Sequence, residues 1–368
     1  MKIIRIVSRI IIGLVFVFSG VVKAIDPLGT AYKFHDYFQA FNLGFLYKLC
    51  LPLAVLMFTA EFISGFSILS GLKFKTGLWG VIILMAIFTP VTFVLALTNP
   101  VSDCGCFGDA IHLTNWQTFG KNIVLVIFLL ILYKERDQIK KIQKEKIEWP
   151  VISVVCVLVI LFSLANLRYL PVIDFLPYKK GVKIADKMIV PEGVPVDKYI
   201  TSFVYEKNGV RKEFSLNNYP AKDSTWKFIE QKSVLIKKGY VPPIHDFQIT
   251  DQNGDNLTNE ILSNKGYSVL MISKKLTEAS GKYLSAGFVL GKYCISKGIN
   301  FFVISASGKD EAKGYENGLS FCSADETTLK TMVRANPGYI LLKDGVIINK
   351  WSWANVPDDE WFGKLPDN

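Results

Sequence analysis

The chain has 368 residues, half of them hydrophobic, and a mean hydropathy of +0.30. This is too apolar for an ordinary soluble protein and predicts a membrane protein with a soluble portion. The formal net charge is +10, but much of the positive charge flanks apolar segments. It therefore predicts membrane topology rather than a nucleic-acid surface. Six cysteines in a chain of this length exclude a disulfide-scaffold protein.

Five apolar segments in the first half of the chain are predicted to cross a membrane. They comprise residues 3–22, 51–69, 78–97, 119–133 and 151–167. The last two are shorter than the about 20 residues that a helical span needs, but their flanks can extend them. Pro90 is expected to kink the third segment. The basic start of the first segment resembles a secretory signal, yet residues 21–26 contain no small-x-small cleavage site, so we predict a retained helix.

Basic residues at the ends of these segments predict the orientation of the spans. They cluster at three places: Lys2, Arg5, Arg9, Lys73, Lys75, Lys134, Arg136, Lys140, Lys141, Lys144 and Lys146. With five spans these places share one side, which the positive-inside rule identifies as the cytoplasm. We therefore predict a multi-pass protein of the bacterial cytoplasmic (inner) membrane, with a cytoplasmic N-terminus and a periplasmic C-terminal domain.

The loop between the third and fourth segments contains the sequence Asp-Cys-Gly-Cys-Phe-Gly-Asp over residues 103–109, without Lys or Arg. Cys104 and Cys106 could form a small, strained disulfide that is easily reduced. Gly105 removes a Cβ that would oppose the tight turn. On the outer side of a bacterial membrane disulfides persist, so we interpret Cys104 and Cys106 as a redox-active, catalytic pair. The attacking species would be a thiolate, which Asp103 and Asp109 are expected to oppose.

Glu61 is the one acidic residue well inside an apolar segment. Its position predicts about mid-bilayer depth at a rise of ~1.5 Å per residue. Two interpretations stay open: an intramembrane functional group, or a structural ion pair or hydrogen bond with Lys23 or a serine. Small residues at helical spacing around Glu61 predict a close helix–helix face; they are Ala60, Ser64, Ser67 and Gly71.

Residues 18–27 resemble the first-helix signature of the DoxX family, and residues 60–71 resemble its second helix. Residues 103–108, followed by Asn115 and Lys121-Asn122, resemble the MauE branch, the methylamine-utilisation membrane proteins. The resemblance covers roughly residues 5–135. It implies a four-helix membrane bundle associated with redox or disulfide handling, and MauE itself is associated with maturation of a disulfide-rich dehydrogenase subunit. The fifth span and the long C-terminal region depart from the simple MauE pattern.

The second half of the chain contains two regions that differ in their sequence pattern. Residues 169–241 predict a linker and a small β-rich connector, in which residues 199–205 and 211–216 flank Asn208-Gly209, a good hairpin signal. From residue 242, strands and helices alternate, which predicts an α/β domain with a central sheet. The predicted strands are residues 247–249, 267–273, 300–305, 339–342 and 346–351, and the predicted helices are residues 279–296 and 326–334.

The order of these elements resembles a thioredoxin-like domain of the peroxiredoxin or TlpA type over roughly residues 242–357. Residues 243–247 are similar to its opening strand, and residues 336–351 to its proline turn and terminal hairpin. The resemblance implies that Pro337 is the cis-proline of a docking turn. Residues 274–280, where such oxidoreductases carry Cys-x-x-Cys, contain no cysteine. We therefore expect docking rather than dithiol exchange here, and Cys294 and Cys322 could pair or stay buried and unpaired.

The predicted fold is an α-helical membrane bundle, with four DoxX/MauE-like helices and a fifth span, followed by a β-rich connector and an α/β thioredoxin-like domain. The predicted domains are a membrane bundle (1–135), a cytoplasmic loop with the fifth span (136–168), a linker and connector (169–241) and the thioredoxin-like domain (242–368).

Two functions fit this organisation. In the first, the protein handles thiol–disulfide redox in the envelope, as an oxidoreductase or an accessory maturation factor, and Cys104–Cys106 exchanges electrons with a client protein that carries a thiol or disulfide. In the second, it is a non-catalytic membrane scaffold with a structural Cys104–Cys106 disulfide. Cys104, Cys106 and His112 are too few ligands for a usual zinc site, so no metal is predicted. No residue identifies a cofactor, although a quinone inside the bundle could accept electrons. The expected partners are the lipid bilayer and the client, not nucleic acid.

Overall fold

The architecture is that of a computed structural model, which describes residues 2–101, 103–139, 145–195, 198–215, 218–220, 223–237, 239–308, 311–312, 314–315 and 318–365. The topology-predicting Lys140, Lys141 and Lys144, and Leu216 at the end of a predicted strand, lie outside these residues. The chain divides into two compact units. Met1–Gly181 and Gln248–Asn368 form the first unit, and Val182–Phe247 forms the second.

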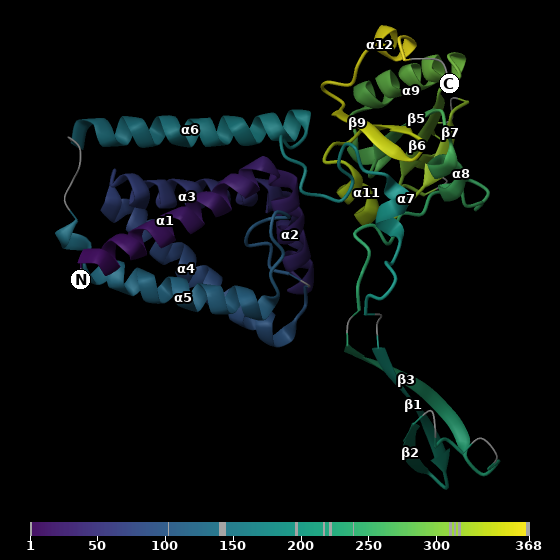
Figure 1. The fold of residues 1–368 in the computed structure, drawn as a ribbon, viewed down its shortest axis with the longest axis horizontal. Coiled ribbons are helices and arrows are strands. Elements are labelled where there is room, and N and C mark those ends of the chain that lie inside the picture. Colours follow the sequence, from purple (N-terminus) through teal and green to yellow (C-terminus); the bar gives the residue numbers. More distant parts are fainter. Residues whose placement is uncertain are drawn as a thin grey trace. The chain divides into compact units, whose positions relative to one another are not determined.

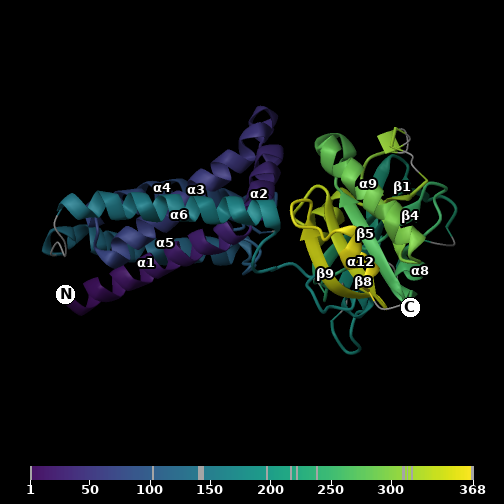
Figure 2. The same cartoon turned by 90° about the horizontal axis from the view of Figure 1, so that it is seen from above.

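Five helices of the first unit are long and apolar enough to span a membrane, which confirms the five predicted segments. They are α1 (Lys2–Ile25), α3 (Cys50–Ser70), α4 (Phe74–Thr98), α5 (Asn115–Lys134) and α6 (Glu145–Tyr169), and they lie alongside one another (Figures 1 and 2). Each extends beyond its apolar core. The fourth predicted segment, for example, began at Phe119, but α5 begins at Asn115 because Thr114 and Gln117 form a capping box.

Small residues allow α1, α3 and α4 to approach closely. A Cβ on Gly20 of α1 would lie 2.9 Å from the carbonyl oxygen of Phe58, and one on Gly77 of α4 would lie 2.9 Å from that of Ser64. Such contacts leave no room for a larger residue. The predicted small-residue face of α3 is thus in contact with a neighbouring helix through Ser64, as small-residue packing in membranes requires.

A further helix, α2 (Pro27–Ala40), and a short 3-10 helix, η1 (Gly44–Leu49), were not predicted from the sequence. The side chain of Asp26 caps α2 by accepting a hydrogen bond from the Gly29 N–H at 2.9 Å, and Pro27 occupies the first turn. Helix α2 lies between two strongly apolar spans in the sequence, and its mixed polar and apolar composition gives no clear helical pattern. This helix carries several residues that contact the cysteine loop.

The second unit contains a short helix, α7 (Ile184–Met188), and a three-stranded antiparallel sheet. Its strands are β1 (Lys198–Lys207), β2 (Val210–Ser215) and β3 (Lys227–Lys237), in the order β2-β1-β3. Asn208 and Gly209 both have positive φ, 54° and 78°, and join β1 to β2. The predicted hairpin is therefore confirmed, and its Asn-Gly pair supplies the left-handed conformation that such a turn needs.

The C-terminal region is built on a six-stranded mixed sheet in the order β4-β7-β6-β5-β8-β9. The strands are β4 (Thr250–Asp251), β5 (Tyr267–Ser273), β6 (Asn300–Ser305), β7 (Ser320–Ser323), β8 (Gly338–Lys343) and β9 (Val346–Ser352). Strands β5, β6 and β7 are parallel, whereas β8 and β9 are antiparallel to their neighbours. The helices of this region include α8 (Thr258–Ser263), α9 (Gly281–Ser296), α11 (Glu326–Met332) and α12 (Asp359–Gly363). Helix α9 lies along the sheet and packs against it (Figure 2).

Two predicted elements of this region differ from the structure: one strand does not form, and one helix is shorter than predicted. Residues 247–249 do not form a strand, because the backbone of Ile249 bonds the Thr258 hydroxyl and the N–H of Leu257 instead of a neighbouring strand. The helix predicted to reach residue 334 ends at Met332, since Val333 is extended. Arg334 therefore lies in the connection to β8, where the Asn336–Pro337 peptide is cis. The thioredoxin-like assignment of this region stays a prediction.

Candidate functional site

The connection between α4 and α5 turns sharply at the two cysteines. Gly105 and Gly108 have positive φ, 61° and 53°, and the N–H of Gly108 bonds the carbonyl of Gly105 at 3.0 Å. A Cβ on Gly105 would lie 2.8 Å from Cγ of Lys33 on α2. Both the turn and the neighbouring helix therefore require glycine at position 105.

The cysteine sulfurs lie close together at this turn. The two Sγ atoms are 2.7 Å apart, and both cysteines are free thiols in this structure. A disulfide has an S–S length of about 2.0 Å, so a small approach would suffice for bond formation. Cys104 is buried, with Sγ 3.3 Å from the Thr118 hydroxyl, and its carbonyl accepts a hydrogen bond from the Tyr37 hydroxyl. As a whole residue Cys106 is less buried than Cys104.

The two thiols are electrostatically unequal. The hydrogen bond from Cys106 is the largest influence on Cys104; with help from the Thr118 hydroxyl and the Lys121 charge, and against burial, it lowers the pKa of Cys104 to about 6. The same hydrogen bond, together with burial, raises the pKa of Cys106 well above its ordinary value. Cys104 is therefore the sulfur that is stabilised as a thiolate.

The two aspartates of the loop do not oppose this thiolate as the sequence had predicted, because both are paired with cations. Asp103 contacts Lys33 at 3.0 Å and His112 at 3.6 Å. Burial would raise the pKa of Asp103, but these two partners lower it below its usual range. Asp109 contacts Arg334 at 2.5 Å. The negative charges are thus neutralised locally, which corrects an expectation based on sequence proximity alone.

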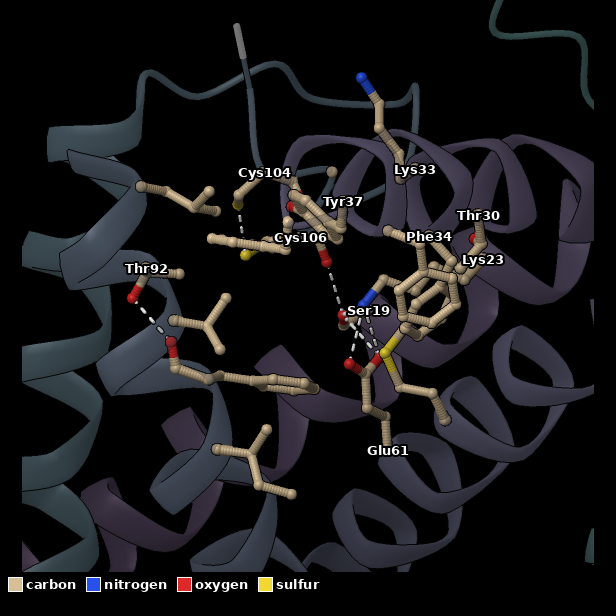
Figure 3. A pocket seen from close by; sticks show the side chains of 18 of the residues that line it. Ser19, Lys23, Thr30, Lys33, Phe34, Tyr37, Glu61, Thr92, Cys104 and Cys106 are labelled. Atoms are coloured by element: carbon tan, nitrogen blue, oxygen red, sulfur yellow. Dashed lines mark hydrogen bonds and ion pairs between the residues drawn. The ribbon is translucent and has the colours of Figure 1, made fainter. Parts of the chain in front are cut away.

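A buried ion pair lies directly beneath the loop. Lys23, in the last turn of α1, bonds both carboxylate oxygens of Glu61 at 2.7 and 2.9 Å, and both side chains are almost fully buried. The Ser19 hydroxyl lies 2.9 Å from Glu61 and 2.8 Å from the Cys106 carbonyl, so its single proton has two competing acceptors (Figure 3). Lys23 is a partner that the sequence suggested for Glu61, and Ser19 is the serine, which the sequence had left unidentified. The structure joins the pair to the cysteine loop through Ser19.

These groups share a cavity of about 260 Å³ inside the bundle, with the sulfurs on one wall and the ion pair on another (Figure 3). Most of its lining is apolar and comes from α2, α3 and α4. The apolar residues are Phe34, Phe38, Phe41, Leu43, Met57, Ile87, Phe88, Val91 and Leu95. Lys121 also lines the cavity, with Nζ 4.7 Å from the ring centroid of Phe107.

The C-terminal region contributes one side chain to the loop. Arg334 is buried and bonds Asp26 at 2.8 Å as well as Asp109 at 2.5 Å, which links the N-cap of α2 to the residues beyond Cys106. Lys274, where a thioredoxin-like protein would begin its Cys-x-x-Cys, donates a hydrogen bond to the Tyr32 hydroxyl of α2. Burial lowers the pKa of Lys274 to about 7. Arg334, which contacts the loop, precedes the predicted docking turn at Pro337 in the sequence.

The sequence had singled out the cysteines, Glu61 and Lys23, and the structure gathers all four around one cavity. It had missed Tyr37, Thr118 and Arg334, it had given Lys121 only as part of the MauE resemblance, and it had suggested a serine for Glu61 without identifying Ser19. The partners of Arg334 are 225 and 308 residues away, so no local pattern could reveal them. Within the described residues no group of three or more His, Cys, Asp or Glu side chains is arranged to hold a metal ion.

Two family models match parts of the chain. Methylamine utilisation protein MauE matches residues 1–134, which hold α1 to α5 and the cysteine loop. A domain of unknown function (DUF8463) matches residues 199–238, which include the strands of the second unit. Comparisons with curated proteins and with solved structures gave no match. The membrane portion is thus similar to MauE, whereas the DoxX resemblance stays a prediction.

Proposed function

We propose that this protein is a thiol–disulfide redox protein of the bacterial envelope, with Cys104 and Cys106 as its exchanging pair. The observation that carries the proposal is the sulfur pair itself, 2.7 Å apart, in which Cys104 is stabilised as an anion and Cys106 keeps its proton. Such asymmetry suits exchange, because a thiol of low pKa is a good leaving group. Residues 1–134 are similar to the methylamine utilisation protein MauE, and the resemblance implies redox or disulfide handling.

The exchange would proceed through a mixed disulfide. A client thiolate attacks Sγ of Cys106, the S–S bond breaks, and Cys104 leaves as a thiolate held by Thr118 and Lys121. The second client thiolate then attacks the mixed disulfide. The client gains a disulfide, and Cys104 and Cys106 are left carrying the two electrons and, after protonation, two protons.

The C-terminal region would act as a docking module in this scheme. Its predicted thioredoxin-like fold lacks the paired cysteines, and Arg334 and Lys274 contact α2 or the loop. We propose that the region lies in the periplasm and presents clients to the loop. The bundle would then be oriented with its N-terminus in the cytoplasm, as the basic residues predict.

A structural disulfide is the alternative that the burial of Cys104 favours. Redox titration of the purified full-length protein, followed by alkylation of free thiols, separates the two functions. We expect the Cys104–Cys106 bond to equilibrate with a glutathione buffer in the folded state. A bond that stays oxidised until the protein unfolds would contradict the exchange function.

Trapping in cells tests the client. Because thiol–disulfide exchange is reversible, Cys106 of the Cys104→Ser variant can attack the disulfide of an oxidised client, which releases one client thiolate. No Cys104 thiolate is then present to resolve the product, so we expect Cys106 to accumulate in a mixed disulfide with an envelope protein. Cys294→Ser is the matched control and should trap nothing. In spheroplasts, a membrane-impermeant thiol reagent should label the Cys104–Cys106 pair after mild reduction. Protection of both cysteines until the membrane is opened would overturn the proposed orientation.

A further inference from the structure

We propose that the cavity beneath the cysteine loop binds the head group of a quinone, which accepts electrons from reduced Cys104 and Cys106. The inference rests on the proposed exchange function and names what would reoxidise the pair. It combines three observations: a cavity shared by the sulfurs and a buried ion pair, an apolar rim within a membrane span, and groups in the cavity that can exchange protons.

The cavity favours a ligand that arrives from the lipid phase. Ile87 and Val91, in the middle of α4, line it and are 55% and 37% exposed, and Phe41 beyond α2 is 43% exposed. In a bilayer such an apolar rim would face hydrocarbon rather than water. A cavity of about 260 Å³ suits a ring-sized head group, and its open rim leaves a path for an apolar tail.

The polar groups of the cavity favour a quinone over a lipid chain. An acyl chain needs only apolar walls, whereas a buried Lys23–Glu61 pair costs desolvation that apolar residues would avoid. A quinone presents two carbonyl oxygens, which accept hydrogen bonds. Lys23 already donates to Ser19 and to both carboxylate oxygens of Glu61, so the ammonium of Lys121, which also lines the cavity, is the donor for such an oxygen. The ring can pack against Phe34 and Phe88 on the same walls.

Electrons and protons balance without a further reactant. The two thiols of Cys104 and Cys106 together give up two electrons and two protons, and their sulfurs join in a disulfide. The quinone takes up the two electrons and two protons and becomes a quinol. The pair thus returns to the form that a client dithiol reduces.

Ser19 links the cysteine loop to the ion pair. Its hydroxyl can donate either to the Cys106 carbonyl or to Glu61, and Lys23 bonds both Ser19, at 3.1 Å, and Glu61. The carbonyl carries no transferable proton, so Ser19 positions the loop over the ion pair and does not carry protons from the sulfurs. The groups of this set that can exchange a proton with a ligand in the cavity are Lys23 and Glu61.

The test uses full-length, pre-reduced protein in nanodiscs, without oxygen, with decylubiquinone as the probe. We expect one quinol per protein by absorbance, matched by the loss of two thiols. Met57→Trp places a large ring in the cavity and should slow quinol formation at least tenfold. Leu56→Trp is the matched control, because Leu56 is 67% exposed on the same helix and does not line the cavity.

The outcomes separate this inference from the function on which it rests. If Cys104–Cys106 exchanges with glutathione but forms no quinol, the quinone site is wrong and the exchange function stands. If neither reaction occurs, the exchange function fails first. If Met57→Trp leaves quinol formation unchanged while its glutathione exchange shows a folded protein, the cavity is not the site. Should Met57→Trp fail to fold, Val91→Trp at the rim provides the same comparison.

Discussion

The protein holds two pairs of cysteines in opposite environments. Cys104 and Cys106 lie on a turn, next to a hydroxyl and a lysine, and the pKa of Cys104 is lowered to about 6. Cys294 on α9 and Cys322 on β7 lie in the core of the C-terminal region as free thiols, and burial raises the pKa of each to about 12. Reactivity thus follows from the surroundings of a thiol and not from the number of cysteines.

The largest expected difference between the two pairs is in alkylation rate. At pH 7 the reduced protein should react with iodoacetamide at Cys104 at least ~1000-fold faster than at Cys294 or Cys322, because only a thiolate reacts and the latter two stay protonated. Below pH 6 the Cys104 rate should fall about tenfold per pH unit as the thiolate is protonated, and above it the rate should level off.

Peptide mass spectrometry at successive times measures all of these rates in one sample. The comparison fails if Cys104 titrates with a midpoint near the ordinary value of about 8.5, or if Cys294 reacts as fast as Cys104 in the folded protein. Unfolding in detergent and urea provides the control, since all thiols should then react at similar rates.

The next largest expected effect is a loss of stability when Arg334 of the C-terminal region can no longer pair with Asp26 and Asp109. Arg334→Met removes the partner of a buried carboxylate, Asp26, and of a partly buried one, Asp109, and should lower the free energy of unfolding by about 3–5 kcal/mol. Thermal unfolding in detergent measures this loss. Combining Arg334→Met with Asp26→Asn and Asp109→Asn should recover part of it, because no unpaired buried charge remains.

The single variant Arg334→Met also shows whether the C-terminal region positions the cysteine loop. Without Arg334 the negative charge of Asp109 is no longer neutralised, so it should raise the pKa of Cys104. Alkylation of Cys294 should stay slow. An equal acceleration at Cys294 would mean that Arg334→Met only loosens the whole C-terminal region. An unchanged stability would show that the Arg334 contacts are absent in solution.

The sequence predicted those parts of the molecule that local patterns determine. The five spans and the buried strands β5 and β6 are continuous apolar runs, and Asn208-Gly209 is a turn whose backbone demands those residue types. The cysteines were found because their spacing is unusual. Each of these signals is complete within about 20 residues of sequence, which is why it could be recognised.

The parts that could not be predicted depend on contacts between distant residues. Helix α2 has no strong periodicity, yet it supplies Lys33 and Tyr37 to the loop. The charge of Asp109 looked unfavourable until Arg334 was found 225 residues away. A sequence shows which charges are present, but only the fold shows which of them neutralise each other.

The smallest expected effect is a change in the pKa of Cys104 when the Thr118 hydroxyl is removed. Thr118→Val keeps the shape of the side chain but removes the donor 3.3 Å from Sγ of Cys104. A hydrogen bond of about 0.5–1.5 kcal/mol to the thiolate corresponds to a rise of roughly half to one unit in its pKa. At pH 6 the alkylation rate of Cys104 should therefore fall about twofold to fivefold, and at pH 8 it should be nearly unchanged. Thr118→Ser retains the hydroxyl and should keep the original profile. A loss of equal size at both pH values would mean that the substitution displaced the loop, because a change in protonation alone disappears once the thiol is fully ionised.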